Sequence, residues 1–190
     1  MKKIKNFDVM ILVNFIANTL IYLISPSINI LIYSSITQSK IAILAIFGCV
    51  VGIVVSLSWA KNPDKLFRYF SHFCIAEVII DIILCIIAIY TKNIVLFYML
   101  YVIISTTIVK NIGAGYNLLK ILRYDSKEKR NTFDNLNNVG INISTIIGSI
   151  LAIVFKPSFN SIIIIYTVAN TIDNIAYAFI VYSLKKNGKI

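Results

Sequence analysis

The stretch that decides the predicted fold is DSKEKRNTFDNLNNVGINISTIIGSILA, residues 125–152. After a charged beginning it continues as an apolar helical sequence in which every fourth residue is small: Gly140, Ser144, Gly148 and Ala152. Small residues at that spacing form a groove on one helix face, where a neighbouring membrane helix can pack closely. A second face of the same helix is polar. We therefore predict a membrane helix between a packed neighbour and a wet space. The polar positions are Asn135, Asn138, Asn142, Thr145 and Ser149.

The composition of the whole chain is that of an all-α membrane protein. Of 190 residues, 58% are apolar and 14% are charged, whereas charged residues make up about 25% of an ordinary soluble domain. A run of about 20 apolar residues spans the hydrocarbon core of a bilayer. We predict a single domain over residues 1–190 with six transmembrane helices, embedded in a lipid bilayer. The predicted spans are 7–33, 40–60, 69–90, 94–122, 132–155 and 159–184.

The basic residues predict the orientation of these spans. The net charge of +10 would suggest nucleic acid in a soluble protein, but here the charge lies in short loops between apolar runs, so no nucleic-acid partner is predicted. Loops with many lysines and arginines stay in the cytoplasm, and only Lys40, Lys92 and Lys156 fall on the opposite side. We expect both termini in the cytoplasm and the protein in the plasma membrane. The residues on the cytoplasmic side are Lys2, Lys3, Lys5, Lys61, Lys65, Arg68, Lys120, Arg123, Lys127, Lys129, Arg130, Lys185, Lys186 and Lys189.

Polar residues at membrane depth fall into stripes on several spans. In the first span, for example, Asn14, Asn18, Tyr22, Ser25 and Asn29 recur every three or four positions. Such residues either hydrogen-bond to neighbouring helices or line a shared hydrated cavity, and both readings stay open at this point. The candidates for a substrate cavity are Asn14, Asn18, Asn29, Lys110, Asn111, Asn138 and Asn142.

Charged residues inside the spans are few. Glu77 and Asp81 stand four residues apart, on one face of the third span, and two carboxylates at that depth cannot both stay charged without partners. Lys110 is the one basic residue deep enough to neutralise them, so we expect Lys110 to approach Glu77 or Asp81. The pair is then either a buried ion pair that fixes helix register or a protonation site coupled to transport. Asp173 in the sixth span is a further ion-coupling candidate.

The sequence contains no motif that is typical of a metal site, a redox site or a catalytic site. Cys49, Cys74 and Cys85 lie inside apolar runs without a CxxC pair, which is typical of small apolar residues. Two of them share a helix face with the carboxylates, but soft thiolates and hard carboxylates spread over three turns do not converge on one ion. His72 is expected at the membrane interface. Because metalloprotease, nucleophile-elbow and phosphate-loop motifs are missing, we predict no enzyme activity, no metal and no cofactor.

A charged cluster precedes the small-residue helix, with Asp125, Glu128 and Arg130 in the loop. This order resembles the major facilitator superfamily, where such a loop between helices four and five leads into a helix rich in glycine. Gly140, Gly148, Ser149 and Ala152 stand at those helix positions. The segment SLSWAKNPDKLFRYF from Ser56 is similar in length and basic residues to the family's loop between helices two and three, with Ser56 and Ala60 at its Gly and Asp positions.

The resemblance implies one N-terminal half of a transporter that normally has twelve spans. In that family a substrate binds between two halves that rock against each other, so this chain would pair with a copy of itself or with a second membrane protein. The groove at Gly140, Ser144, Gly148 and Ala152 would then be a dimer contact. The function this implies is transport of a small molecule of unknown identity. The alternatives are an accessory or immunity protein that binds another membrane protein and, with less in its favour, an intramembrane enzyme.

Overall fold

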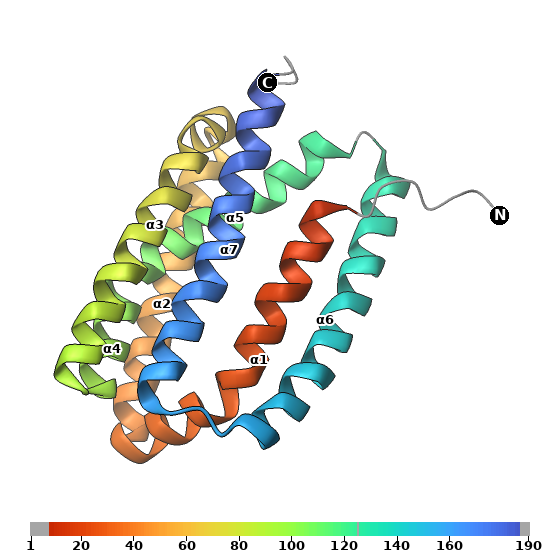
Figure 1. Cartoon of the computed structure of the whole chain (residues 1–190). Helices are drawn as coiled ribbons and strands as arrows, with labels where there is room; N and C mark the ends of the chain where they lie inside the picture. The colour runs from red at the N-terminus through yellow and green to blue at the C-terminus, as the bar shows by residue number, and fades with distance from the viewer. Residues whose placement is uncertain (1–7, 125, 187–190) are drawn as a thin grey trace.

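Residues 8–124 and 126–186 of the computed structural model are described below, and within them the chain is helical from end to end (Figure 1). Lys2, Lys3, Lys5, Phe7, Asp125 and Lys189, which the sequence analysis uses, lie outside this part. The helices are α1 (Val9–Ser35), α2 (Gln38–Ala60), α3 (Pro63–Thr91), α4 (Ile94–Leu100), the π-helical segment η1 (Tyr101–Ser105), α5 (Thr106–Arg123), α6 (Lys127–Phe155) and α7 (Phe159–Lys186).

Six helices in the described ranges are long and apolar enough to cross a membrane, with α4, η1 and α5 forming one span, Ile94–Arg123. This confirms the prediction of a multi-pass, all-helical membrane protein. Three helices begin earlier than predicted: α2 by two residues, α3 by six and α6 by five. The two larger differences arise because the first turns of α3 and α6 lie in the polar loops. Pro63 opens α3 at a position where proline needs no hydrogen-bond partner, and the Ser126 hydroxyl accepts a hydrogen bond from the Lys129 amide at the start of α6.

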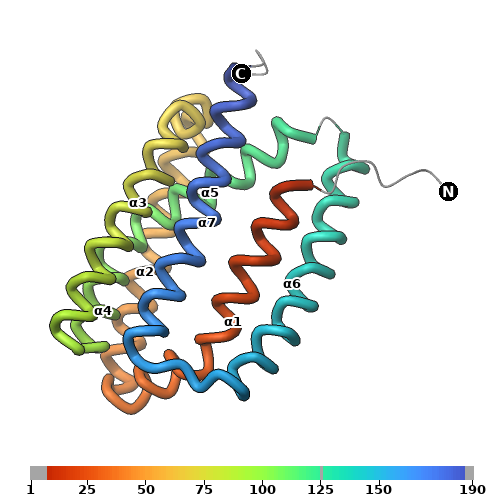
Figure 2. Tube along the Cα trace, viewed as in Figure 1, coloured from red at the N-terminus to blue at the C-terminus, as the bar shows by residue number. Residues whose placement is uncertain are grey.

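The first three spans and the last three have matching neighbours (Figure 2). The first span, α1, packs against α6 and α7; the fourth, from α4 to α5, packs against α2 and α3; and α3 packs against α7. Exchanging the first three spans for the last three, in order, turns the two pairings of α1 into the two pairings of the fourth span and leaves the pairing of α3 with α7 unchanged. Three is an odd number, so the last three spans run in the opposite sense to the first three. The start of α1 and the end of α7 lie at the same end of the bundle (Figure 1).

The groove on α6 is filled by α1 of the same chain. Ser144 and Gly148 are buried, and a Cβ atom on Gly148 would lie 2.7 Å from the Thr19 carbonyl oxygen and 3.0 Å from the Leu23 backbone nitrogen. Backbone atoms of α1 therefore occupy the groove, which leaves no room there for a second copy. The interpretation of this groove as a dimer contact is wrong, because the sequence shows a close approach without showing which helix makes it.

Polar contacts fasten the beginning of α1 to the end of α5. The Asp8 carboxylate accepts hydrogen bonds from the Met10 amide at 2.9 Å, from Arg123 Nη2 at 3.2 Å and from the Tyr124 hydroxyl. One carboxylate thus caps α1 and pairs with a cation beyond the apolar part of the fourth span. A second ion pair, Lys120 with Asp134 at 2.9 Å, joins α5 to α6.

Tyr124 is expected to make the free energy of unfolding depend on pH in the alkaline range. Burial, together with the hydrogen bond to Asp8, raises the pKa of the Tyr124 phenol above its ordinary range. The unfolded phenol ionises first as pH rises, so the free energy of unfolding should fall above about pH 10. Tyr124→Phe should make this fall shallower, measured by thermal unfolding in detergent between pH 8 and 11. Tyr90→Phe, at an exposed position of α3, is the control. Equal slopes for both variants and wild type would contradict the assignment.

Candidate functional site

The charges at membrane depth do not meet. Glu77 and Asp81 are 1% and 2% exposed, whereas Lys110 is exposed, and among the described residues Lys110 forms no ion pair. The expected pairing of Lys110 with Glu77 or Asp81 is therefore wrong. The reason is the rotation of α5. Its Gly115 faces Phe70 of α3, while Lys110 lies on another face, where its Cε would be 3.4 Å from a Cβ on Gly52 of α2.

A first cavity lies beside the carboxylates, between α3, the fourth span and α7. Its volume is about 130 Å³, and Glu77 and Asp173 both line it. Asp81 is one helical turn from Glu77 and is equally buried. Two predicted ion-coupling residues on α3 and one on α7 thus gather in one region of the bundle. The other lining residues are Tyr101, Val109, Ile112, Asn170, Asn174 and Tyr177.

The buried carboxylates lack hydrogen-bond partners in the described part of the chain. Neither oxygen of Glu77 or of Asp81 has one, nor does the Ser105 hydroxyl. Ser105 neighbours Glu77 and Asn170 neighbours Asp81, in neither case with regular hydrogen-bond geometry. An ionised carboxylate away from water costs several kcal/mol. Neutralising the two groups removes this cost, and a bound proton on each is the smallest species that does so.

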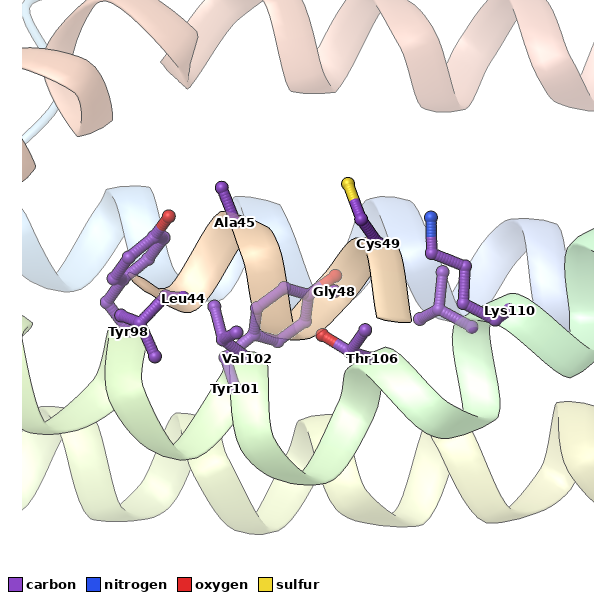
Figure 3. Close-up of a pocket in the computed structure, with 10 residues that line it drawn as sticks. Leu44, Ala45, Gly48, Cys49, Tyr98, Tyr101, Val102, Thr106 and Lys110 are labelled. Carbon is purple, nitrogen blue, oxygen red and sulfur yellow. The ribbon is translucent and has the colours of Figure 1, made fainter. Parts of the chain in front are cut away.

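A second cavity lies on the other side of the fourth span, against α2, and has a volume of about 290 Å³. Lys110, Thr106 and Tyr98 give it polar groups, while α2 contributes small and apolar residues. Figure 3 shows the side chains of Cys49 and Lys110 pointing to the same side. The rest of the lining is Leu44, Ala45, Gly48, Tyr101, Val102 and Val109.

Tyr101 and Val109 line both cavities, so their side chains form a wall that the two spaces share. Tyr101 begins the π-helical segment η1, and Ser105, beside Glu77, ends it. The Tyr101 ring packs edge-on against Tyr166 of α7, with centroids 5.3 Å apart. A π-helical turn holds one residue more than an α-helical turn and often occurs at functional sites. Nothing in the sequence marks this segment, since its residues, YVIIS, suit an ordinary membrane helix.

Asn14 joins four helices and lines neither of these two cavities. Its side-chain amide donates to Asn137 Oδ1 of α6 at 2.8 Å and to the Tyr116 hydroxyl of α5 at 3.4 Å. The Tyr177 hydroxyl of α7 donates to Asn14 Oδ1. Here the reading of polar residues as contacts between helices is the one that applies. Asn137 and Tyr116 were not singled out in the sequence, where the Asn-rich run at 135–138 was the available signal.

The remaining cavity candidates take other positions. Asn18 donates to the Asn14 carbonyl oxygen within α1 at 2.6 Å. Asn111 is buried, donates to the Thr107 carbonyl oxygen at 2.6 Å and accepts a hydrogen bond from the Trp59 indole of α2. The candidates with exposed side chains are Asn29, Asn138 and Asn142. Of the residues predicted to line a substrate cavity, Lys110 is the one that borders either of these two cavities.

Asn14→Leu should destabilise the bundle. It removes three hydrogen bonds between helices and leaves the buried Tyr177 hydroxyl without its partner. Each such bond within a membrane contributes roughly 0.6 kcal/mol, so the loss should be about 2 kcal/mol and lower the melting temperature in detergent by several degrees. Asn18→Leu, which loses a bond within its own helix only, is the matched control. Equal melting temperatures for the two variants would show that the four-helix junction contributes little.

No protein-family model, curated protein or solved structure matches this chain. The resemblance to the major facilitator superfamily therefore rests on the residues quoted for it and stays a prediction.

Proposed function

We propose that the chain is a six-span transport unit that moves a small molecule across a membrane in step with protons, with Glu77 and Asp81 as the proton site. The observation that carries this proposal is the separation of charges at membrane depth. Lys110 lies on one side of the fourth span, and Glu77 and Asp81 of α3 lie on the other. Among the described residues, the lysine forms no ion pair with either carboxylate. Ionisable residues inside a membrane are costly and usually mark ion or substrate pathways.

A purely structural role fits these residues poorly. A buried ion pair would offset part of the cost of its own burial, but neither Glu77 nor Asp81 forms an ion pair within residues 8–124 and 126–186. Leucine or alanine at these positions would satisfy packing without that cost. The free-energy cost of burying these carboxylates is explained if they take up and release protons as the bundle changes conformation.

The shared wall supplies a way to couple the two spaces. A ligand in the Lys110 cavity contacts Tyr101 on one side, while the carboxylates lie beyond it on the other. A ligand shifts a conformational equilibrium only through different affinities for its two states. Rearrangement of the π-helical turn would move Tyr101 and Ser105 together, so that proton and ligand act on the same element.

The matching neighbours of the first three and the last three spans support the likeness to a transporter half, because inverted repeats of this kind are a common plan among secondary transporters. The flanking helices α2 and α6 each have one main neighbour, and Asn138 and Asn142 of α6 are exposed. A second copy or a second membrane protein would cover these amides, which lipid cannot hydrogen-bond. The positively charged loops support cytoplasmic termini and a plasma-membrane location.

Everted membrane vesicles offer a test of proton coupling. With an established pH gradient reported by a quenched acridine dye, a panel of radiolabelled small molecules is added one at a time. A transported compound should accumulate and change the dye signal in wild-type vesicles, and the Glu77→Gln, Asp81→Asn double variant should do neither. A stoichiometric co-purifying membrane protein, with no movement of any compound through the reconstituted chain alone, would instead support the accessory role.

A further inference from the structure

Lys110 stands near the middle of its span. Sixteen residues separate it from Ile94 and thirteen from Arg123, which places it roughly 20 Å from either end of the helix. A lysine side chain reaches the interface only from positions close to a helix end. The Lys110 ammonium group therefore needs a counter-charge or water at its own depth, and no carboxylate of the described residues supplies the charge.

The cavity around Lys110 combines one cation with apolar and aromatic surface. Glycine at positions 48 and 52 of α2 lets the side chains of Thr106 and Lys110 approach this helix closely. A Cβ on Gly52 would lie 3.8 Å from Lys110 Nζ, and one on Gly48 would lie 3.7 Å from Thr106 Cγ2. Lys110 and Thr106 of α5 and Tyr98 of α4 give the cavity polar groups, and Tyr101 and aliphatic side chains complete the lining.

We propose that this cavity binds a small organic anion, with its carboxylate or similar acidic group on Lys110 and its apolar body against Tyr98, Tyr101 and α2. The inference rests on the proposed function and names the class of molecule transported. The volume of about 290 Å³ is near the lower end of the range for ligand pockets, which suits one ring or a short chain. A lipid phosphate is excluded by depth, since headgroups lie at the ends of the span.

The charge layout agrees with joint movement of anion and proton. The anion neutralises Lys110 in one cavity, and one proton on each carboxylate neutralises Glu77 and Asp81 across the Tyr101 wall. A bundle that carries the anion and these protons has no uncompensated charge at Lys110, Glu77 or Asp81, whereas a bundle that lacks either has one. Conformational change is then least costly when both sites are filled.

Equilibrium binding to the purified full chain in detergent tests the anion site without requiring transport. The probes are benzoate, benzamide and benzylamine, which share a ring and differ in charge. Wild type should bind benzoate at least tenfold more tightly than benzamide and should not bind benzylamine. Loss of a charged hydrogen bond should weaken benzoate binding by Lys110→Met roughly 10- to 100-fold, with benzamide unchanged and with binding largely kept in Lys110→Arg.

Three results would overturn this inference: no binding of any probe by wild type, no preference for benzoate, or unchanged benzoate binding by Lys110→Met. Capture of an acidic membrane partner by wild type but not by Lys110→Met, without benzoate binding, would also overturn it and assign the lysine to an interface. Glu128→Gln, at an exposed position in the first turn of α6, should keep benzoate binding. Benzoate binding without proton-driven movement of any compound would disprove the proposed function while leaving the anion site standing.

Discussion

Gly148→Ala is expected to destabilise the six-helix unit strongly, although alanine normally stabilises a helix by about 1 kcal/mol relative to glycine. The added methyl group would lie 2.6 Å from Tyr22 Cβ and 2.7 Å from the Thr19 carbonyl oxygen. Backbone atoms cannot move aside as a flexible side chain can, so α1 and α6 must separate. Overpacking of this kind costs about 3 kcal/mol, which corresponds to a fall of roughly 10 °C in melting temperature.

Gly140→Ala on the same helix is the matched control. Its methyl group would meet Ile11 Cγ2 at 3.9 Å, an ordinary contact, so this variant should melt at or slightly above the wild-type temperature. A second pair of glycines repeats the comparison on α5. Alanine at position 115 would overlap the ring of Phe70, which is fully buried, whereas alanine at 113 meets nothing within 4 Å. A Gly148→Ala protein that melts normally but fails to self-associate would restore the dimer-contact interpretation.

The second large effect is expected on transport. Glu77→Gln and Asp81→Asn, alone and together, should reduce proton-driven uptake or efflux to the level of empty vesicles, because an amide keeps the shape of the carboxyl group but cannot exchange a proton. The melting temperature should stay within a few degrees of wild type, since neither carboxylate has a hydrogen-bond partner to lose among the described residues. This outcome is the reverse of that expected for Asn14→Leu, which should lower stability.

Glu128→Gln serves as the control for these carboxylates. Glu128 is exposed in the first turn of α6, outside the apolar part of the helix, and its amide variant should transport normally. Wild-type levels of proton-driven transport in the Glu77→Gln, Asp81→Asn double variant would remove these residues from the mechanism. A large fall in melting temperature would show instead that they stabilise the fold through a partner.

The sequence alone predicts those features that depend on a single helix. Span number follows from the apolar runs, and the helix that needs small residues follows from Gly148 and Ser144. Partners could not be predicted in the same way, because the rotation of each helix depends on all of its neighbours. Lys110 lies at a membrane depth at which it could meet Glu77. However, Gly115 of the same helix faces Phe70 of α3, and this rotation of α5 places Lys110 against α2. Likewise, the stripe on α1 predicts polar contacts without saying that Asn14 meets Asn137.

The most direct test of the central claim, that the carboxylates hold a proton and are independent of Lys110, is infrared spectroscopy of the reconstituted protein at neutral pH. The account predicts a carboxyl stretching band from protonated acid in wild type. That band should be missing from the Glu77→Gln, Asp81→Asn double variant and unchanged in Lys110→Met. A wild-type spectrum without the band, together with its appearance in Lys110→Met, would contradict the account by showing that Lys110 keeps the carboxylates ionised.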